Sequence, residues 1–155
     1  MEDLIFKIDA KSESATKTVV KARNFEIVID EPASLGGTDH GANPVEYLLA
    51  SYAGCLNVVA HITAKELNIP SENLEINLTG KLNPLRFLGK SANERAGFKE
   101  IKVNITSSDD IDETIKQRWI SEILDRCPVG DNLKNSTEIV VELESIGKEL
   151  VENFS

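Results

Sequence analysis

The chain has 155 residues, of which 41% are hydrophobic and 28% are charged, which is the usage of an ordinary globular domain rather than of a disordered or collagen-like chain. Its formal net charge of -9 gives no sequence-wide attraction to phosphate backbones or anionic lipid, which disfavours nucleic-acid and membrane partners. Because no segment has the pattern of a signal peptide or a run of about 18 apolar residues, we expect a single soluble, cytoplasmic domain over residues 1–155.

The beginning of the chain is predicted to be β-rich. Residues 4–8, 17–22 and 25–30 have the composition of strands, and the last of these stretches alternates apolar and polar residues as a half-buried strand does. A segment at 31–44, punctuated by glycines, has the composition of turns.

A long helix is predicted to follow, from Pro44 to about Leu67, because apolar residues recur there at helical spacing. Asn43 is placed to cap it, Pro44 takes its first position and Glu46 its third, as in an N-terminal capping box. The segment is apolar on nearly all sides, so we expect a buried central helix.

The middle of the chain is predicted to form a hairpin. Residues 73–82 and 98–106 have the pattern of strands, and a loop at 83–97 separates them. We expect these two strands to pair in antiparallel fashion.

Two helices and a last strand are predicted to complete the chain. Asp110 and Glu113 form a D-x-x-E start for a helix that ends at Arg126, and a short helix restarts at Pro128. Residues 137–143 have the pattern of a strand.

Runs of strands with segregated helices indicate an α+β fold rather than a parallel βαβ sheet. One long apolar helix beside a mostly two-layer sheet exposes more hydrophobic surface than a monomer tolerates. We therefore expect a symmetric homodimer.

The chain has two cysteines, Cys55 and Cys127, which are too far apart for a CxxC redox pair or a CxxC zinc knuckle. Cys127 directly precedes Pro128, so it takes an N-cap position where the positive helix end favours a thiolate, with Arg126 beside it. The alternative for Cys127 is a small capping or packing residue.

Cys55 lies well beyond the first turn of its helix, so it needs a cation from elsewhere to become a thiolate. Ser51, Tyr52, Val58 and Val59 flank it on the helix, whereas His61 lies about 120° away and is a poor Cys–His partner. A papain-like hydrolase is therefore disfavoured. On its own, Cys55 is better explained as a small buried hydrophobe.

Two stretches together carry a resemblance to a known family. DEPASLGGTDHGANPVEYLLASYAGC (30–55), followed much later by RCPVGDNL (126–133), resembles the OsmC/Ohr family, the osmotically inducible and organic hydroperoxide resistance proteins. The likeness extends over most of the chain, with residues 78–105 similar to the mid-region hairpin of the family.

The resemblance implies an intertwined homodimer in which curved antiparallel sheets surround a long central helix, with two active sites at the subunit interface. It implies a thiol peroxidase for organic hydroperoxides, in which Cys55 attacks the peroxide and becomes a sulfenic acid. Cys127 then resolves the sulfenic acid to an intramolecular disulfide. No metal or organic cofactor is required, and an external dithiol reduces the disulfide.

The family pairs its reactive cysteine with an arginine from the N-terminal sheet and a glutamate near the start of the central helix. A guanidinium favours the thiolate, and a carboxylate orients the guanidinium. Arg23 is the only arginine before Cys55 and is the candidate, with a solvated strand-end residue as its alternative. Glu46 is the second candidate, either for the site of the partner subunit or only as part of the capping box, because the hydroperoxide resistance branch carries its glutamate where this chain has Val45.

Other charged residues have weaker claims. Arg86 and Arg95, in the loop at 83–97, are reserve candidates for the cation, and His40 is expected to be a solvated loop histidine. Two further functions stay open: a non-catalytic dimer of the same fold that binds small molecules or a protein partner, and a structural protein held by a disulfide.

Overall fold

The computed structural model describes residues 2–107 and 111–144. Three antiparallel strands in the order β1-β2-β3 form the first sheet, and a short 3-10 turn then leads into a long helix. These elements are β1 (Asp9–Ser12), β2 (Thr18–Ala22), β3 (Phe25–Ile29), η1 (Ala33–Leu35) and α1 (Pro44–Leu67). The strands predicted at 17–22 and 25–30 and the long helix are confirmed.

The second half of the chain holds an antiparallel hairpin and two helices, namely β4 (Glu75–Lys81), β5 (Glu100–Thr106), α2 (Glu113–Arg126) and α3 (Pro128–Lys134). The predicted hairpin and the helix that restarts at Pro128 are confirmed. The start of α2 was predicted too early, because Asp112 is its N-cap and accepts a hydrogen bond from the Thr114 amide at 2.9 Å. Asp110 lies outside the described residues.

Local signals fix the beginning of α1. Asn43 Oδ1 accepts a hydrogen bond from the Glu46 amide at 2.9 Å, and Glu46 Oε2 accepts one from the Asn43 amide at 2.8 Å. This is the predicted capping box, with Pro44 at the first helical position.

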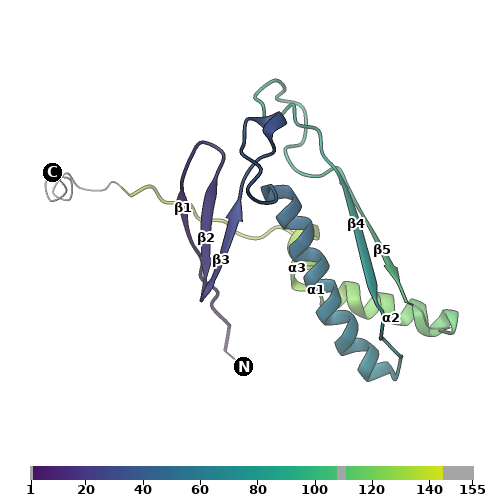
Figure 1. Cartoon of the computed structure of the whole chain (residues 1–155). Helices are drawn as coiled ribbons and strands as arrows, with labels where there is room; N and C mark the ends of the chain where they lie inside the picture. The colour runs from purple at the N-terminus through teal and green to yellow at the C-terminus, as the bar shows by residue number, and fades with distance from the viewer. Residues whose placement is uncertain (1, 108–110, 145–155) are drawn as a thin grey trace, which may run out of the picture.

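Helix α1 lies between the two sheets, with β1–β3 on one side and β4–β5 on the other (Figure 1). Its buried face packs against α2 and α3, where Leu56, Ala60 and Ile123 have no exposed surface. The indole Nε1 of Trp119 on α2 donates to the Ala60 carbonyl and to Thr63 Oγ1, both at 3.0 Å. The core therefore joins α1 to α2 through packing and through satisfied polar groups.

The prediction of a buried central helix is confirmed for one face of α1 only in the single chain. Its second face is exposed, and Val58 and Ile62 keep 56% and 46% of their surface accessible. Among the helices of the described residues, only α1 is long and apolar enough to cross a membrane. The core helix of a soluble protein meets the same two criteria.

The strands predicted at the two ends of the chain are wrong. Residues 4–8 are not a strand, because β1 begins at Asp9, and residues 137–143 have no regular structure. Ile5 and Leu143 are almost fully exposed. Both stretches have the sequence of strands but no strand of the described chain to pair with.

Candidate functional site: a thiol pair beside a cavity

The two cysteines meet although the sequence separates them widely. Cys55 lies midway along α1, and Cys127 lies at the corner between α2 and α3. Cys127 Sγ donates a hydrogen bond to Cys55 Sγ at 2.8 Å, and both side chains are free thiols. Since a covalent S–S bond is about 2.05 Å long, a small displacement is enough to join them.

The corner at Cys127 is built by the residues around it. Cys127 ends α2 and caps α3, and its Sγ accepts a hydrogen bond from the Gly130 amide at 3.4 Å. Pro128 then begins α3 at its first position. The predicted capping role of Cys127 is confirmed.

Burial favours the protonated form of the Cys127 thiol. Burial raises its pKa most, the hydrogen bond to Cys55 raises it further, and the Gly130 amide only partly opposes them. Arg126 does not help, because its guanidinium pairs with Glu66 on α1. Burial thus opposes the thiolate predicted from the cap position, because desolvation outweighs the field of a short helix.

The two thiols differ in their access to solvent. Cys127 is only 1% exposed, whereas Cys55 is partly exposed, at the edge between the buried and the exposed faces of α1. A reagent from solvent therefore reaches Cys55 first.

A cavity of about 390 Å³ has two neighbours of this pair, Tyr52 and Gly130, in its lining, whereas neither cysteine lines it. Tyr52 lies one turn before Cys55, and Gly130 contacts Cys127. The remaining lining mixes apolar and charged residues: Leu48, Arg95, Gly97, Phe98, Lys99, Glu100, Ile101, Val103, Leu133 and Lys134.

Tyr52 is electrostatically coupled to both sulfurs. Burial raises the pKa of Tyr52 most, and the charges of Cys127 and Cys55 raise it further. The phenol is thus held in its neutral, hydrogen-donating form. The sequence shows Tyr52 beside Cys55 on the helix, but the spacing alone gives it no role.

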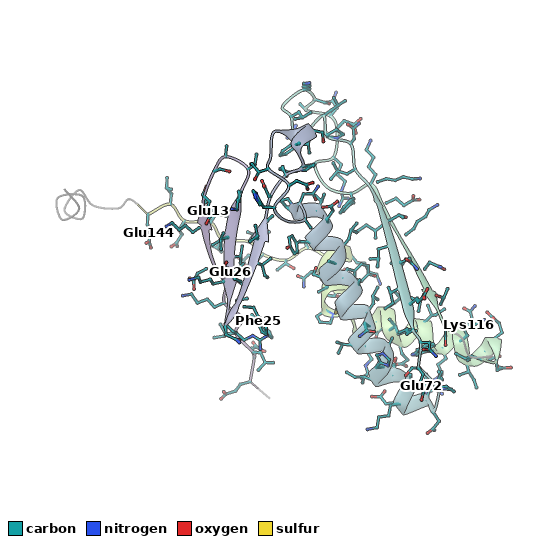
Figure 2. All side chains as sticks on the ribbon, viewed as in Figure 1. Glu13, Phe25, Glu26, Glu72, Lys116 and Glu144 are labelled. Atoms are coloured by element: carbon teal, nitrogen blue, oxygen red, sulfur yellow. The ribbon has the colours of Figure 1, made fainter. Side chains whose placement is uncertain are left out.

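Arg23 does not reach the thiols of its own chain. It is exposed in the turn between β2 and β3, where its guanidinium carbon lies 5.0 Å from the centre of the Phe25 ring. Figure 2 shows Phe25 at the end of this hairpin, apart from α1. Glu46 is engaged in the capping box. In the described chain, no hydrogen bond or ion pair joins either residue to a cysteine.

The reserve candidates differ in position. Arg95 lines the cavity, and among the described residues its side chain makes no hydrogen bond or ion pair. Arg86 Nη1 donates to the Ala92 carbonyl at 2.7 Å and holds the loop instead. His40 is mainly exposed, and its Nδ1 lies 2.6 Å from Thr38 Oγ1. His61 Nδ1 lies 3.0 Å from Ser71 Oγ and is not a partner for Cys55.

Asp30 is a buried polar residue that the sequence did not single out. It has no exposed surface, and its carboxylate accepts hydrogen bonds from the amides of Glu31 and Thr38 and from the Thr38 hydroxyl. These bonds fix the segment that leads into α1. Within residues 2–107 and 111–144, no group of three or more His, Cys, Asp and Glu side chains is placed to hold a metal ion.

The chain thus has an α+β fold with two sheets, and its central helix carries one of two thiols in contact. A family model described as OsmC-like protein matches residues 37–142, so the chain belongs to the OsmC family. No curated protein matches it.

Solved structures have the same fold. An OsmC-like protein from Mycoplasma pneumoniae is 23% identical with a TM-score of 0.72, over 87% of this chain and 91% of that one. An organic hydroperoxide resistance protein OsmC from Legionella pneumophila is 18% identical with a TM-score of 0.64, over 85% and 92%. The organic hydroperoxide resistance protein OhrB of Bacillus subtilis is 21% identical with a TM-score of 0.58, over 86% and 93%. At these identities the likeness shows the OsmC-like fold.

Proposed function

We propose that this protein is a thiol peroxidase that reduces organic hydroperoxides. The observation that carries the proposal is the contact between an accessible thiol, Cys55, and a buried one, Cys127, at 2.8 Å. Relatives of the same fold are named organic hydroperoxide resistance proteins, and the apolar side chains in the cavity that Tyr52 lines suit an alkyl group.

The reaction assigns one step to each thiol. The Cys55 thiolate attacks the outer oxygen of the hydroperoxide, so that an S–O bond forms as the O–O bond breaks. Sulfur loses two electrons, and the alkoxide that leaves becomes an alcohol by taking a proton from water. Cys127 then attacks the sulfenic acid, which releases water and leaves a disulfide. An external dithiol returns both thiols, and the protein needs no metal or organic cofactor.

We propose that the working unit is a homodimer. The exposed face of α1 and the two unpaired apolar stretches at 4–8 and 139–143 together expose more hydrophobic side chains than a soluble monomer tolerates. A second copy that pairs with these stretches would bury them and cover the edge of α1 where Cys55 lies. We also propose a cytoplasmic location, where a reducing environment keeps free thiols reduced.

A dimer is also the means by which Arg23 and Glu46 would serve the site. Arg23 is exposed and has no carboxylate partner in the described chain, so its guanidinium is free to lie beside the Cys55 of a partner subunit. Glu46 is exposed at the start of α1 and would orient that guanidinium. Both assignments belong to this proposal.

The test is a count of free thiols in the fully reduced protein before and after one equivalent of cumene hydroperoxide, with hydrogen peroxide for comparison. Rapid loss of both thiols, faster with the organic peroxide, is expected, and mass spectrometry should find a Cys55–Cys127 disulfide. Survival of both thiols would overturn the proposal and favour a binding protein that keeps the fold. Formation of the disulfide in air, with no preference for peroxide, would indicate a structural bridge.

A further inference from the structure

The Tyr52 hydroxyl is a polar group without a partner in the wall of the thiol site. Tyr52 is only 6% exposed, and among the described residues its hydroxyl makes no hydrogen bond. Every fully buried side-chain nitrogen or oxygen of the described chain has a partner. The Tyr52 oxygen is therefore reached by solvent, although the rest of the side chain is buried.

The Tyr52 ring lies close to both thiols. Residues three apart on a helix are neighbours on its surface, so Tyr52 lies beside Cys55. A Cβ placed on Gly130 would lie 3.1 Å from Tyr52 Cε2 and 3.5 Å from Cys127 Sγ. Since Cε2 is bonded to the carbon that carries the hydroxyl, the polar end of the ring lies close to the corner that holds Cys127.

The hydroxyl of the second tyrosine, Tyr47, has a structural role. Tyr47 also lies on α1, but its hydroxyl donates to the Val28 carbonyl on β3 at 2.9 Å. That bond ties the first sheet to the helix. Tyr52 makes no such bond, and its side chain is part of the lining of the cavity.

We propose that the Tyr52 hydroxyl donates a hydrogen bond to the peroxide oxygen that leaves when Cys55 attacks. This inference rests on the proposed peroxidase function and adds a residue to it. Negative charge develops on the leaving oxygen as the O–O bond breaks, and a donor already placed there stabilises it without reorganisation. Tyr52 keeps its own proton, consistent with its raised pKa, and water protonates the alkoxide.

The test compares Tyr52→Phe with Tyr47→Phe as the matched control. The rate of oxidation of the reduced protein by tert-butyl hydroperoxide, followed through Trp119 fluorescence, should fall by about 10- to 100-fold in Tyr52→Phe. In Tyr47→Phe it should stay within about threefold of the wild-type rate, because that hydroxyl holds β3 and not the substrate. An unchanged rate in Tyr52→Phe would overturn the inference while the peroxidase function stands.

A second rate separates hydrogen bonding from packing. Alkylation of Cys55 by iodoacetamide breaks no O–O bond, so its rate in Tyr52→Phe should stay within about twofold of wild type. An equal fall in the alkylation and peroxide rates would show a structural role and overturn the inference. If the wild-type protein does not react with the peroxide, the proposed function fails, and the inference fails with it.

Discussion

The Cys127 thiol donates a hydrogen bond to Cys55 Sγ at 2.8 Å, which joins the middle of α1 to the corner between α2 and α3. The donor is buried and has a raised pKa, whereas the acceptor is partly exposed. The reduced pair is thus asymmetric: the Cys55 sulfur is accessible to solvent, and the Cys127 sulfur is buried and donates the hydrogen bond.

This asymmetry predicts different defects for the two cysteine variants. Cys55→Ser should lose peroxide consumption down to the uncatalysed rate, because Cys127 is out of reach of solvent. Cys127→Ser should keep its first oxidation within about threefold of wild type and accumulate a sulfenic acid at Cys55, since serine also caps a helix. Mass spectrometry after dimedone trapping measures both. A sulfenic acid at Cys127 in Cys55→Ser would reverse the assignment.

The raised pKa of Cys127 predicts a loss of stability in alkali. The unfolded thiol has a pKa near 8.5, so in the alkaline range above this value the unfolded state releases a proton that the folded state retains. The free energy of unfolding of the reduced protein should therefore fall with rising pH over this range. Urea titrations measure the slope, and Cys127→Ala should flatten it even if its overall stability is lower. An equal slope in the variant would refute this origin.

The sequence predicted the structure correctly where an element depends on residues close to it in the chain. Asn43, Pro44 and Glu46 placed the start of α1, and Cys127 with Pro128 placed the start of α3, because caps are local interactions. The stretches at 4–8 and 137–143 failed for the opposite reason, since a strand needs a partner that lies elsewhere.

The site was predictable only in part. The resemblance paired the two cysteines, but their spacing in the sequence says nothing of an Sγ–Sγ contact. The cap position of Cys127 predicts a lowered pKa, whereas burial, which depends on tertiary packing, raises it. The hydroxyl of Tyr52 could be suspected from its place one turn before Cys55, whereas the hydrogen bonds of Asp30 come from a loop whose path the sequence does not define.

Asp30 is predicted to stabilise the segment that leads into α1. The Thr38 hydroxyl donates to its carboxylate and, with backbone amides, holds its pKa well below the usual range. This stability is present above the unfolded pKa of about 3.9 and is lost as the pH falls below it. Asp30→Asn should therefore lower the urea midpoint at pH 7 and flatten its decline below pH 4.

The matched control is Asp39→Asn, which neutralises an exposed carboxylate in the same loop. Its urea midpoint should stay close to that of the wild-type protein at both pH values. Equal effects of the two variants would indicate that net charge, and not the buried hydrogen bonds of Asp30, is responsible.

The exposed face of α1 is predicted to be a dimer interface. Val58 is 56% exposed in the single chain, so an aspartate there costs the isolated fold little, but it places a charge in an apolar interface. Light scattering should find the wild-type protein as a dimer and Val58→Asp as a monomer. Thr114→Asp adds the same charge on the exposed start of α2 and should remain dimeric. A monomeric wild type would contradict the proposed assembly.

Arg23 has an unusual backbone for a non-glycine residue. Its φ is 58° in the two-residue turn of a hairpin, a left-handed conformation that costs an L residue about 1 kcal/mol or more and that glycine adopts freely. An arginine does not stabilise this turn, so we expect its side chain to have a functional role.

Arg23→Gly is therefore predicted to separate stability from activity. The glycine relieves the backbone, so the free energy of unfolding should stay equal or rise by up to about 1 kcal/mol. The rate of oxidation by tert-butyl hydroperoxide should fall at least about tenfold, because the guanidinium that favours the Cys55 thiolate is lost. Arg95→Gln tests the arginine at the cavity, and Arg118→Gln on the exposed face of α2 controls for net charge. A large fall in Arg95→Gln with an unchanged rate in Arg23→Gly would move the cation of the site from the hairpin to the loop.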